Sequence, residues 1–505
     1  KYLSLLARKQ LFLVFLTFLL VLFDNSAVIS KSVISTEQTR QDQLHSEETY
    51  QVSQNFLDIN FGGNYYPKLA EADRFYKQGN LVKAREIQRQ VKPDFPPTSQ
   101  PPIPLAGEEE LSPVAKEYWL AANQALAQEP DEKKIIKKEI LNPLQNLVDE
   151  SPQFVPGHIL LADTYFNLLS KEKKGLSVIE KASELYPDRE DVLDKRIEFL
   201  LSEGKPLEAS IAAREFAYTY PGNPKSSDYT KAADQYYEQY QDKLQARLGI
   251  TTVVGAGGQV ATGNQNAALS LGEILLTGES NAGQLISDSY KSQLKMVSNQ
   301  DQLQYVNNIG QELAKLMGRD EFTYEFNIVV DPTPNAFALP GGKIFIHTGM
   351  LNIIDSEAEL AGVLSHEIAH SVLSHGYKKI ADSALTNTGV GILSNLLGSN
   401  TGTSLLQVGE ILLNQKFSRD KEKQADILGL RVLAAADYSA DGLYNIMAKL
   451  EQLEDSSNFA QSLLSSHPDS ENRMRYIEEL IQNKGYNRHA FEGVEEYQAT
   501  FPGYS

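Results

Sequence analysis

The clearest chemical signal in the sequence is a pair of histidines four residues apart, His366 and His370. On an α-helix, residues at this spacing share a face and lie about 6 Å apart along the axis. Both imidazoles can therefore bind one metal ion at about 2.0–2.1 Å. Glu367 can reach the side of the metal where water binds and act as a general base. This pattern is typical of metal-dependent peptide hydrolysis; the alternative is two surface histidines on a solvated helix.

A catalytic zinc needs a third protein ligand and one position left for water. Glu422 is the candidate, because it stands at the start of a predicted helix, 52 residues after His370. Asp426 is one helical turn further on, where its carboxylate can accept a hydrogen bond from a ligand histidine and fix the ring. Two histidines and one glutamate favour zinc over softer or harder metals, so we expect one Zn²⁺ per chain.

The histidines require a helix that holds them in place. Ser356 and Glu359 fit a capping box at its start, and the apolar residues around the histidines predict that the helix is buried. Residues 324–330 and 343–347 are predicted strands.

Between these two strands lies a short segment bracketed by prolines. Its residues are Asn335, Ala336, Phe337, Ala338 and Leu339. We expect an edge strand on which the substrate backbone pairs, with Phe337 or Leu339 shaping a subsite. The alternative is a plain hairpin.

Four motifs therefore follow one another between about residues 285 and 485. They are residues 335–342, residues 366–370, Ser418-Arg419 with residues 422–426, and Ser466-His467-Pro468 followed by Arg473. Together they resemble the zinc metallopeptidase family that includes the CaaX prenyl protease, HtpX and BepA. The resemblance implies a gluzincin fold with a small sheet beside the active-site helix. It also implies zinc on His366, His370 and Glu422, with Glu367 as the general base.

The same resemblance assigns roles to two later residues. His467 is implied to be either an oxyanion donor or a reversible fourth ligand that holds the enzyme shut; the alternative is a turn histidine. Arg473 is implied to stabilise the oxyanion or to orient His467. The CaaX protease and HtpX carry several membrane spans, whereas residues 383–413 of this chain are too weakly hydrophobic and too interrupted by glycine to predict one, so the chain resembles the BepA type more closely. BepA-like proteins carry their repeats after the protease domain, whereas here the predicted repeats come first.

Upstream of these motifs the sequence predicts antiparallel helices. The pair Tyr186-Pro187 recurs as Tyr220-Pro221, 34 residues later, and under this shift Gly175 matches Ala209. A helix-turn-helix period of this length resembles tetratricopeptide repeats. Such an array would present substrates or bind an envelope protein partner; the alternative is a helical array without a binding function.

Composition and the N-terminus limit the function class and the location. The chain has 505 residues, no cysteine and a net charge of −19, so a cysteine nucleophile is excluded and nucleic acid is not an expected partner. An apolar run at residues 11–23 follows Arg8 and Lys9. Its length suits a signal peptide better than a bilayer span. We expect export to the periplasm or cell envelope, with the run either cleaved or kept as an anchor and the only membrane contact.

The expected fold is mostly α-helical: a tetratricopeptide-like array followed by an α+β gluzincin domain with a small β-sheet. The predicted boundaries are 1–30 for a signal peptide or N-terminal membrane anchor, 31–66 for a linker, 67–240 for the helical repeat region, 241–285 for a Gly/Ser-rich connector, 286–490 for the zinc metallopeptidase domain and 491–505 for a C-terminal tail.

The expected function is a zinc metalloendopeptidase that hydrolyses misfolded or stalled envelope proteins. The alternative is a repeat-based adaptor or chaperone whose peptidase domain is latent and closed by His467. The retained Glu367 favours the enzyme, because a pure scaffold does not need a general base. A peptidase that removes residues from the N-terminus also stays open.

Overall fold

The computed structural model describes residues 61, 63–97, 103–248, 271–385, 416–456, 467 and 470–502. Those from residue 63 onward belong to one compact unit, Gly62–Ser505. The predicted signal peptide or anchor, most of the predicted linker, and Ser466 and Pro468 lie outside the described residues. Within the described ranges, no helix is both long enough and apolar enough to cross a bilayer.

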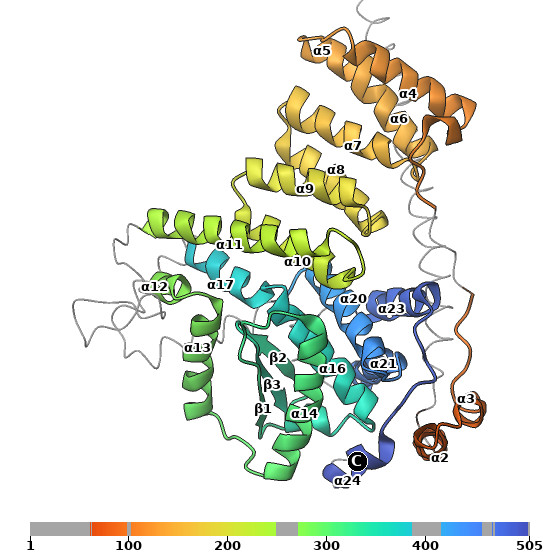
Figure 1. Ribbon diagram of the computed structural model, residues 1–505, viewed down its shortest axis with the longest axis vertical. Coiled ribbons are helices and arrows are strands. Elements are labelled where there is room, and N and C mark those ends of the chain that lie inside the picture. Colours follow the sequence, from red (N-terminus) through yellow and green to blue (C-terminus); the bar gives the residue numbers. More distant parts are fainter. Residues whose placement is uncertain are drawn as a thin grey trace, which may run out of the picture. The chain divides into compact units, whose positions relative to one another are not determined.

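A series of antiparallel helices precedes the histidine motif (Figure 1). These helices are α4 (Pro113–Leu126), α5 (Lys133–Ile135), α6 (Asn142–Glu150), α7 (Val155–Asp163), α8 (Glu172–Leu185), α9 (Glu190–Ser202), α10 (Pro206–Thr219) and α11 (Ser226–Leu248). Each helix from α7 to α11 packs on the next one. The predicted helical array is therefore confirmed, and its kinship with tetratricopeptide repeats stays a prediction.

Small residues let these helices approach closely. A Cβ atom at Gly175 on α8 would lie 2.7 Å from the Cβ of Phe166 and 2.8 Å from the carbonyl oxygen of Ala162. The Phe166 ring in turn stacks on Phe199 of α9, with 3.9 Å between the ring centroids. Ala209 on α10, the predicted counterpart of Gly175, is fully buried. The matched positions Gly175 and Ala209 are thus both small, buried residues of the array.

The second part of the compact unit combines a small sheet with helices. Its elements are α12 (Leu271–Leu276), α13 (Glu279–Gln293), α14 (Gln300–Met317), β1 (Glu325–Val329), β2 (Ala336–Leu339), β3 (Lys343–His347), α15 (Thr348–Leu351), α16 (Glu357–Val372), α17 (His375–Leu385), α20 (Arg419–Ala435), α21 (Asp441–Ser456), α23 (Ser470–Lys484) and α24 (Val494–Thr500). The strand order is β1-β3-β2, with β3 parallel to β1 and antiparallel to β2. This confirms a mostly α-helical chain with an α+β region that contains a small sheet.

One face of the sheet packs in a hydrophobic cluster, and the other face lies toward α16. Phe337, Leu339 and Phe345 pack with residues of α11, α12, α13 and α17. Because successive side chains of a strand point to opposite faces, Ala336 and Ala338 face the other way. Strand β2, at the edge of the sheet, contacts α16 and thereby places its backbone beside the histidine motif.

Helix α16 is the central element of this region. The side chain of Ser356 accepts a hydrogen bond from the backbone N–H of Glu359 at 3.3 Å, which caps the helix as predicted. Every residue from Ala358 to Val372 is buried. A Cβ atom at Gly362 would lie 2.7 Å from the backbone nitrogen of Leu443, so only glycine permits this approach of α21. The sheet, α14, α20 and α21 therefore surround the two histidines.

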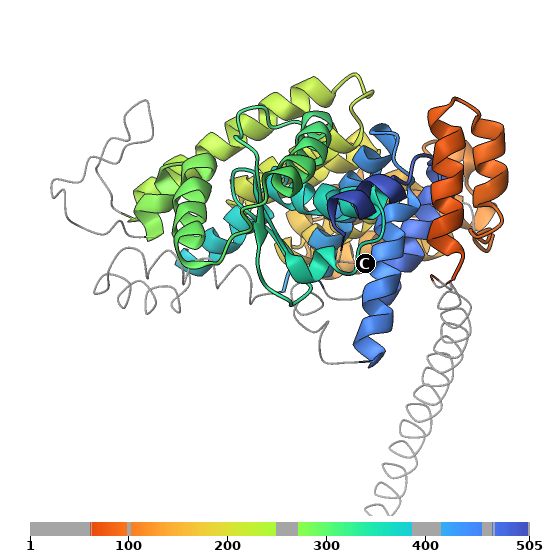
Figure 2. The same cartoon turned by 90° about the horizontal axis from the view of Figure 1, so that it is seen from below.

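An N-terminal helical hairpin packs on the C-terminal part of the chain (Figure 2). It consists of α2 (Tyr65–Lys77) and α3 (Leu81–Gln88). The Asp73 carboxylate accepts hydrogen bonds from the backbone N–H groups of residues 492–494 at 2.9–3.2 Å. Lys92, just after α3, is buried against Glu492. The first helices of the predicted repeat region thus contact the predicted C-terminal tail, and the domain boundaries stay a prediction.

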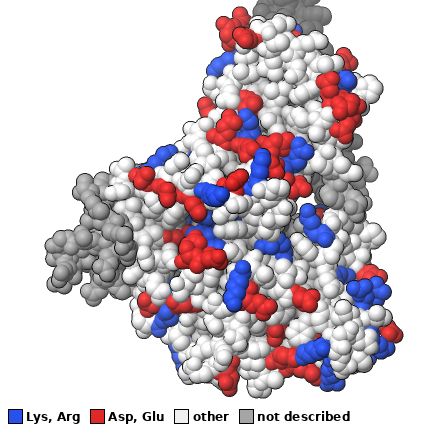
Figure 3. Space-filling view, viewed as in Figure 1, with Lys and Arg blue, Asp and Glu red and all other residues white. Residues whose placement is uncertain are grey.

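Acidic and basic side chains are interspersed over the face shown in Figure 3. Both signs occur over the helical array and over the region around the sheet. The net charge of −19 is therefore not gathered into one acidic patch on this face.

Candidate metal centre

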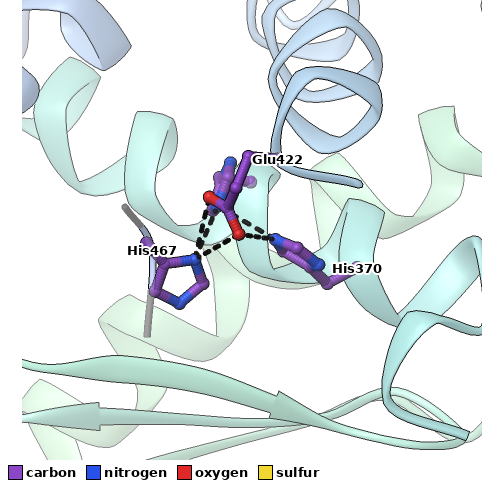
Figure 4. A group of neighbouring side chains, drawn as sticks. His370, Glu422 and His467 are labelled. Carbon is purple, nitrogen blue, oxygen red and sulfur yellow. Dashed lines mark hydrogen bonds and ion pairs between the residues drawn. The ribbon is translucent and has the colours of Figure 1, made fainter. Parts of the chain in front are cut away.

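Four buried side chains meet beside the sheet (Figure 4). His366 and His370 come from α16, Glu422 comes from the first turn of α20, and His467 comes from the segment before α23. One possible ligand atom from each residue lies within 4.8 Å of all the others. The Nε2 atoms of the two α16 histidines are 3.1 Å apart. The Nδ1 atom of His467 lies 3.3 Å from His366 Nε2 and 3.1 Å from both carboxylate oxygens of Glu422.

These separations fit ligands that share one zinc ion. Tetrahedral ligands at about 2.0–2.1 Å from zinc lie about 3.3 Å from one another. The distances His366 Nε2–Glu422 Oε2 and His370 Nε2–Glu422 Oε1 are both 3.5 Å. Imidazoles with a carboxylate are a donor set that zinc prefers. The structure thus brings the predicted three ligands together and places His467 in the fourth position.

The start of α20 and one glycine explain the position of Glu422. The Ser418 side chain accepts a hydrogen bond from the backbone N–H of Lys421 at 3.5 Å and begins the helix. A Cβ atom at Gly429 would lie 3.1 Å from the backbone nitrogen of His366. Glycine at this position therefore allows α20 to lie directly against the histidine helix.

Asp426 lies behind His366, where the sequence predicted it. Its Oδ1 is 2.8 Å from His366 Nδ1, so the imidazole donates from Nδ1 and presents the lone pair of Nε2 to the metal position. Arg473 donates two hydrogen bonds of 2.8 Å to the Asp426 carboxylate, and Tyr476 donates a third. Burial opposes ionisation, but Arg473 and His366 outweigh it and hold the pKa of Asp426 below its usual range.

Arg473 also contacts a proposed zinc ligand directly. Its Nη1 is 2.9 Å from Glu422 Oε2, and the guanidinium is buried. The two contacts neutralise the carboxylates of Glu422 and Asp426, which would otherwise be costly to bury together. Arg473 thus touches the ligand residues themselves, whereas the sequence prediction gave it a role at the oxyanion or beside His467.

His375 contacts the second histidine ligand, and the sequence analysis did not identify it. Its Nδ1 is 2.9 Å from His370 Nδ1, and its Nε2 is 3.0 Å from Gln424 Oε1. Ser374 has a left-handed backbone (φ 57°), which separates α16 from α17 and turns His375 back toward His370. Helical periodicity could not predict this contact, because the helix ends between the two residues.

The two ligand histidines differ in their affinity for protons. Burial disfavours the charged ring of His366, but Asp426 outweighs burial and raises the pKa of His366 to about 9. Burial is the main cause that lowers the pKa of His370 to about 3. A metal ion in this cluster therefore competes with protons more strongly at His366 Nε2 than at His370 Nε2.

Glu367 lies beside the ligand cluster with one free carboxylate oxygen. Its side chain is buried, and Oε1 is 3.7 Å from His467 Nε2. Oε2 is buried and makes no hydrogen bond within the described part of the chain. A buried carboxylate oxygen without a partner is suited to hold a reacting water molecule.

A mostly apolar pocket of about 390 Å³, including its mouth, adjoins the cluster. Its lining residues are Ala336, Met350, Val363, His366, Glu367, Leu443, Ile446, Met447, Leu450, His467 and Arg473. Ala336 is the residue of the predicted substrate strand that reaches this pocket. Phe337 instead stacks on Phe345 in the cluster on the opposite face of the sheet, with 5.1 Å between the ring centroids.

Comparisons with known proteins find both a family and individual relatives that resemble part of this chain. Residues 300–481 match peptidase family M48. The mitochondrial metalloendopeptidase OMA1 of Schizosaccharomyces pombe is 32% identical over 200 residues, which cover 39% of this chain and 58% of that protein. The metalloprotease YcaL of Escherichia coli is 27% identical over 34% of this chain and 68% of its own length. The beta-barrel assembly-enhancing protease of Yersinia pestis is 27% identical over 34% of this chain and 37% of its own length.

The matched segment contains the proposed ligands, the proposed general base and the residues behind them. This chain spans 58% of the fission yeast relative and between 31% and 54% of the other OMA1 proteins matched. The matched region and its metal-binding cluster support the predicted family and its zinc chemistry. Over residues 300–481, the chain is therefore similar to peptidase family M48.

Proposed function

We propose that the chain is a zinc-dependent endopeptidase in which His366, His370 and Glu422 hold the metal and Glu367 is the general base. One observation carries this proposal: Glu367 lines the same pocket as His366 and His467, and its buried Oε2 has no hydrogen-bond partner among the described residues. An acceptor beside three metal ligands and an apolar pocket is the arrangement that peptide hydrolysis by activated water requires.

In this mechanism each residue has a defined task. Zinc, when bound, would lower the pKa of the attacking water and polarise the scissile carbonyl group. Glu367 Oε2 takes the proton from that water as the oxygen attacks the carbonyl carbon. The same carboxyl group then gives the proton to the amine nitrogen as the C–N bond breaks. His467, once it has moved from the fourth ligand position, can donate to the oxyanion.

The substrate is proposed to be an extended polypeptide. Strand β2, which begins at Ala336, is an edge strand, so residues 335–338 offer backbone groups that can pair with a substrate. Seven aliphatic or thioether side chains line the adjoining pocket. Such a pocket takes an apolar substrate side chain better than a charged one.

We expect the protein to cleave an internally quenched peptide with a blocked N-terminus and a central leucine. Removal of metal by dialysis against 1,10-phenanthroline should abolish cleavage, and zinc should restore it, because the ligand cluster holds the ion that activates water. A matched peptide with a central glutamate should be cleaved more slowly. Cleavage that requires a free N-terminus would identify an aminopeptidase, and cleavage that survives metal removal would contradict the proposal.

The second candidate function is that of an adaptor or chaperone whose peptidase domain is latent. His467 favours it, because its Nδ1 lies within 3.1–3.3 Å of His366 Nε2 and the Glu422 carboxylate, in the position that water would need. Closed four-ligand zinc sites are typical of structural rather than catalytic zinc.

The variant His467→Ala decides between the two. If His467 closes an active enzyme, its removal should raise casein hydrolysis several-fold, measured as acid-soluble fluorescence per minute. His489→Ala, at a half-buried histidine outside the cluster, should leave the rate unchanged. No hydrolysis by either wild type or His467→Ala would favour the adaptor, and a lower rate would assign His467 to the oxyanion.

We base a proposal for the protein's location and partners on the names of its relatives and on the predicted leader sequence. One group of relatives is named as mitochondrial metalloendopeptidases, and another as beta-barrel assembly-enhancing proteases. The protein is proposed to be exported to the cell envelope, in agreement with these names and with the apolar run at residues 11–23. Its helical array is proposed to bind substrates or an envelope protein. Recovery of a tagged full-length chain in the cytoplasmic fraction alone would rule out this location.

A further inference from the structure

A chain of three hydrogen bonds connects the helical array to a proposed zinc ligand. Nδ1 of His375 is 2.9 Å from His370 Nδ1, and Nε2 of His375 is 3.0 Å from Gln424 Oε1. Gln424 Nε2 then donates to Oε2 of Glu215 at 2.7 Å. Glu215 belongs to α10, whereas Gln424 lies on α20, two residues after the ligand Glu422. The contacts therefore run from α10 through α20 and α17 to the metal centre.

The chemistry of each group fixes the direction of these hydrogen bonds. An ionised carboxylate only accepts, so the Gln424 amide must point its NH₂ group toward Glu215. Its carbonyl oxygen then faces His375 and accepts from Nε2–H. A neutral imidazole with a proton on Nε2 has a lone pair on Nδ1. His370 must therefore donate from Nδ1, which leaves the lone pair of its Nε2 for a metal.

The opposite direction would require a proton on the Glu215 carboxyl group. If the Gln424 amide were reversed, its carbonyl oxygen would lie 2.7 Å from a carboxylate oxygen of Glu215 without a proton between them. Burial raises the pKa of Glu215, whereas Arg196, with Nη1 3.8 Å from the same Glu215 oxygen, and the Gln424 amide both stabilise the ionised carboxylate. Glu215 therefore decides which way the amide points, and the amide decides which nitrogen of His375 carries the proton.

We propose that Glu215, Gln424 and His375 are positioning residues that fix the tautomer and orientation of His370 for metal binding. Asp426 does the same for His366 from within the matched peptidase region. Glu215 lies outside residues 300–481, so a helix of the array becomes part of the metal centre. The inference rests on the proposed function in one respect, namely that His370 is a zinc ligand.

The first test compares two acidic residues of α10 that both contact the peptidase region. Glu215→Ala removes the end of the relay, and Glu208→Ala removes an ion pair to Lys378 of α17, 3.1 Å long, that is not part of it. Both side chains are partly exposed, so both variants should fold. Glu215→Ala should weaken zinc binding about 10-fold in a chelator competition, within the 10–100-fold range typical for partners of ligand histidines. Glu208→Ala should bind zinc like wild type.

A spectroscopic readout separates positioning from a loss of packing. The cobalt(II)-substituted protein should show a shifted visible absorption band in Glu215→Ala, since the orientation of one imidazole changes, and an unshifted band in Glu208→Ala. Thermal unfolding of the metal-free proteins should be alike for the two variants. Wild-type zinc affinity together with a wild-type cobalt spectrum in Glu215→Ala would overturn the relay.

Exchanging the amide and the carboxylate between positions 215 and 424 should rescue zinc binding. Gln424→Glu alone places two carboxylates 2.7 Å apart and should weaken zinc binding by about 10–100-fold. Adding Glu215→Gln restores one donor and one acceptor in the same positions, so the double variant should recover to within about 3-fold of wild type. A double variant as weak as the single one would contradict the relay. Failure of the wild-type protein to bind zinc at all would instead refute the proposed function.

Discussion

Glu367→Gln is expected to lower kcat for peptide hydrolysis by about 10²–10⁴-fold, the usual contribution of a general acid–base group. The amide keeps the shape of the side chain but cannot take a proton from the attacking water. The zinc ligands are other residues, so zinc content should stay at the wild-type value. Casein hydrolysis and metal content, measured on the same preparations, check both expectations.

A matched control for this variant is Asp420→Asn on α20. Asp420 is an exposed carboxylate two residues before Glu422, outside the ligand cluster. The Asp420→Asn protein should keep the wild-type zinc content and the wild-type activity. A Glu367→Gln protein that hydrolyses casein at the wild-type rate would remove Glu367 from the mechanism, even if zinc is present.

Arg473→Met is expected to lower the free energy of unfolding of the metal-free protein by about 3–5 kcal/mol, the usual effect of removing one partner of a buried ion pair. Methionine fills much of the space but leaves the buried carboxylates of Asp426 and Glu422 without their cation. Urea unfolding followed by circular dichroism measures the change. The exposed arginine two residues later on the same helix supplies the control: Arg475→Met should change stability by about 0.5 kcal/mol or less.

The decrease in the free energy of unfolding caused by Arg473→Met should also depend on pH. The pKa of Asp426 is depressed in the folded protein, so its contribution to stability is fully present above the unfolded pKa of about 3.9 and is lost as pH falls. Without Arg473 this contribution shrinks. The difference between wild type and Arg473→Met should therefore be largest near pH 7 and narrow below about pH 4. A difference that stays the same at every pH between 7 and about 2.5 would contradict this electrostatic explanation.

Much of the fold and the centre could be predicted because the chemistry is local in sequence. The spacing of His366 and His370 on one helix places both rings on one side, and the cap at Ser356 marks where that helix begins. Glu422 and Asp426 are likewise one turn apart on a single helix, so one backbone conformation aims both carboxylates at the histidines. The fold class was predicted correctly for the same reason: helical periodicity and strand signals are local patterns.

The remaining features depend on contacts between distant parts of the chain. His375 reaches His370 only because Ser374 adopts a left-handed backbone, which is uncommon for serine and therefore could not be predicted from the sequence. Glu215 meets Gln424 across more than 200 residues, and neither residue type signals the contact. Asp73 caps backbone N–H groups near residue 493 in the same way. Strand alternation in residues 335–339 could have indicated that Ala336 and Phe337 face opposite sides, although not which side holds the pocket.

Anomalous diffraction at the zinc absorption edge, from crystals grown with zinc, tests the proposed zinc site directly. We expect one peak per chain, about 2.0–2.1 Å from Nε2 of His366, Nε2 of His370 and a carboxylate oxygen of Glu422. A peak elsewhere, or no peak while these three side chains contact only one another, would contradict it.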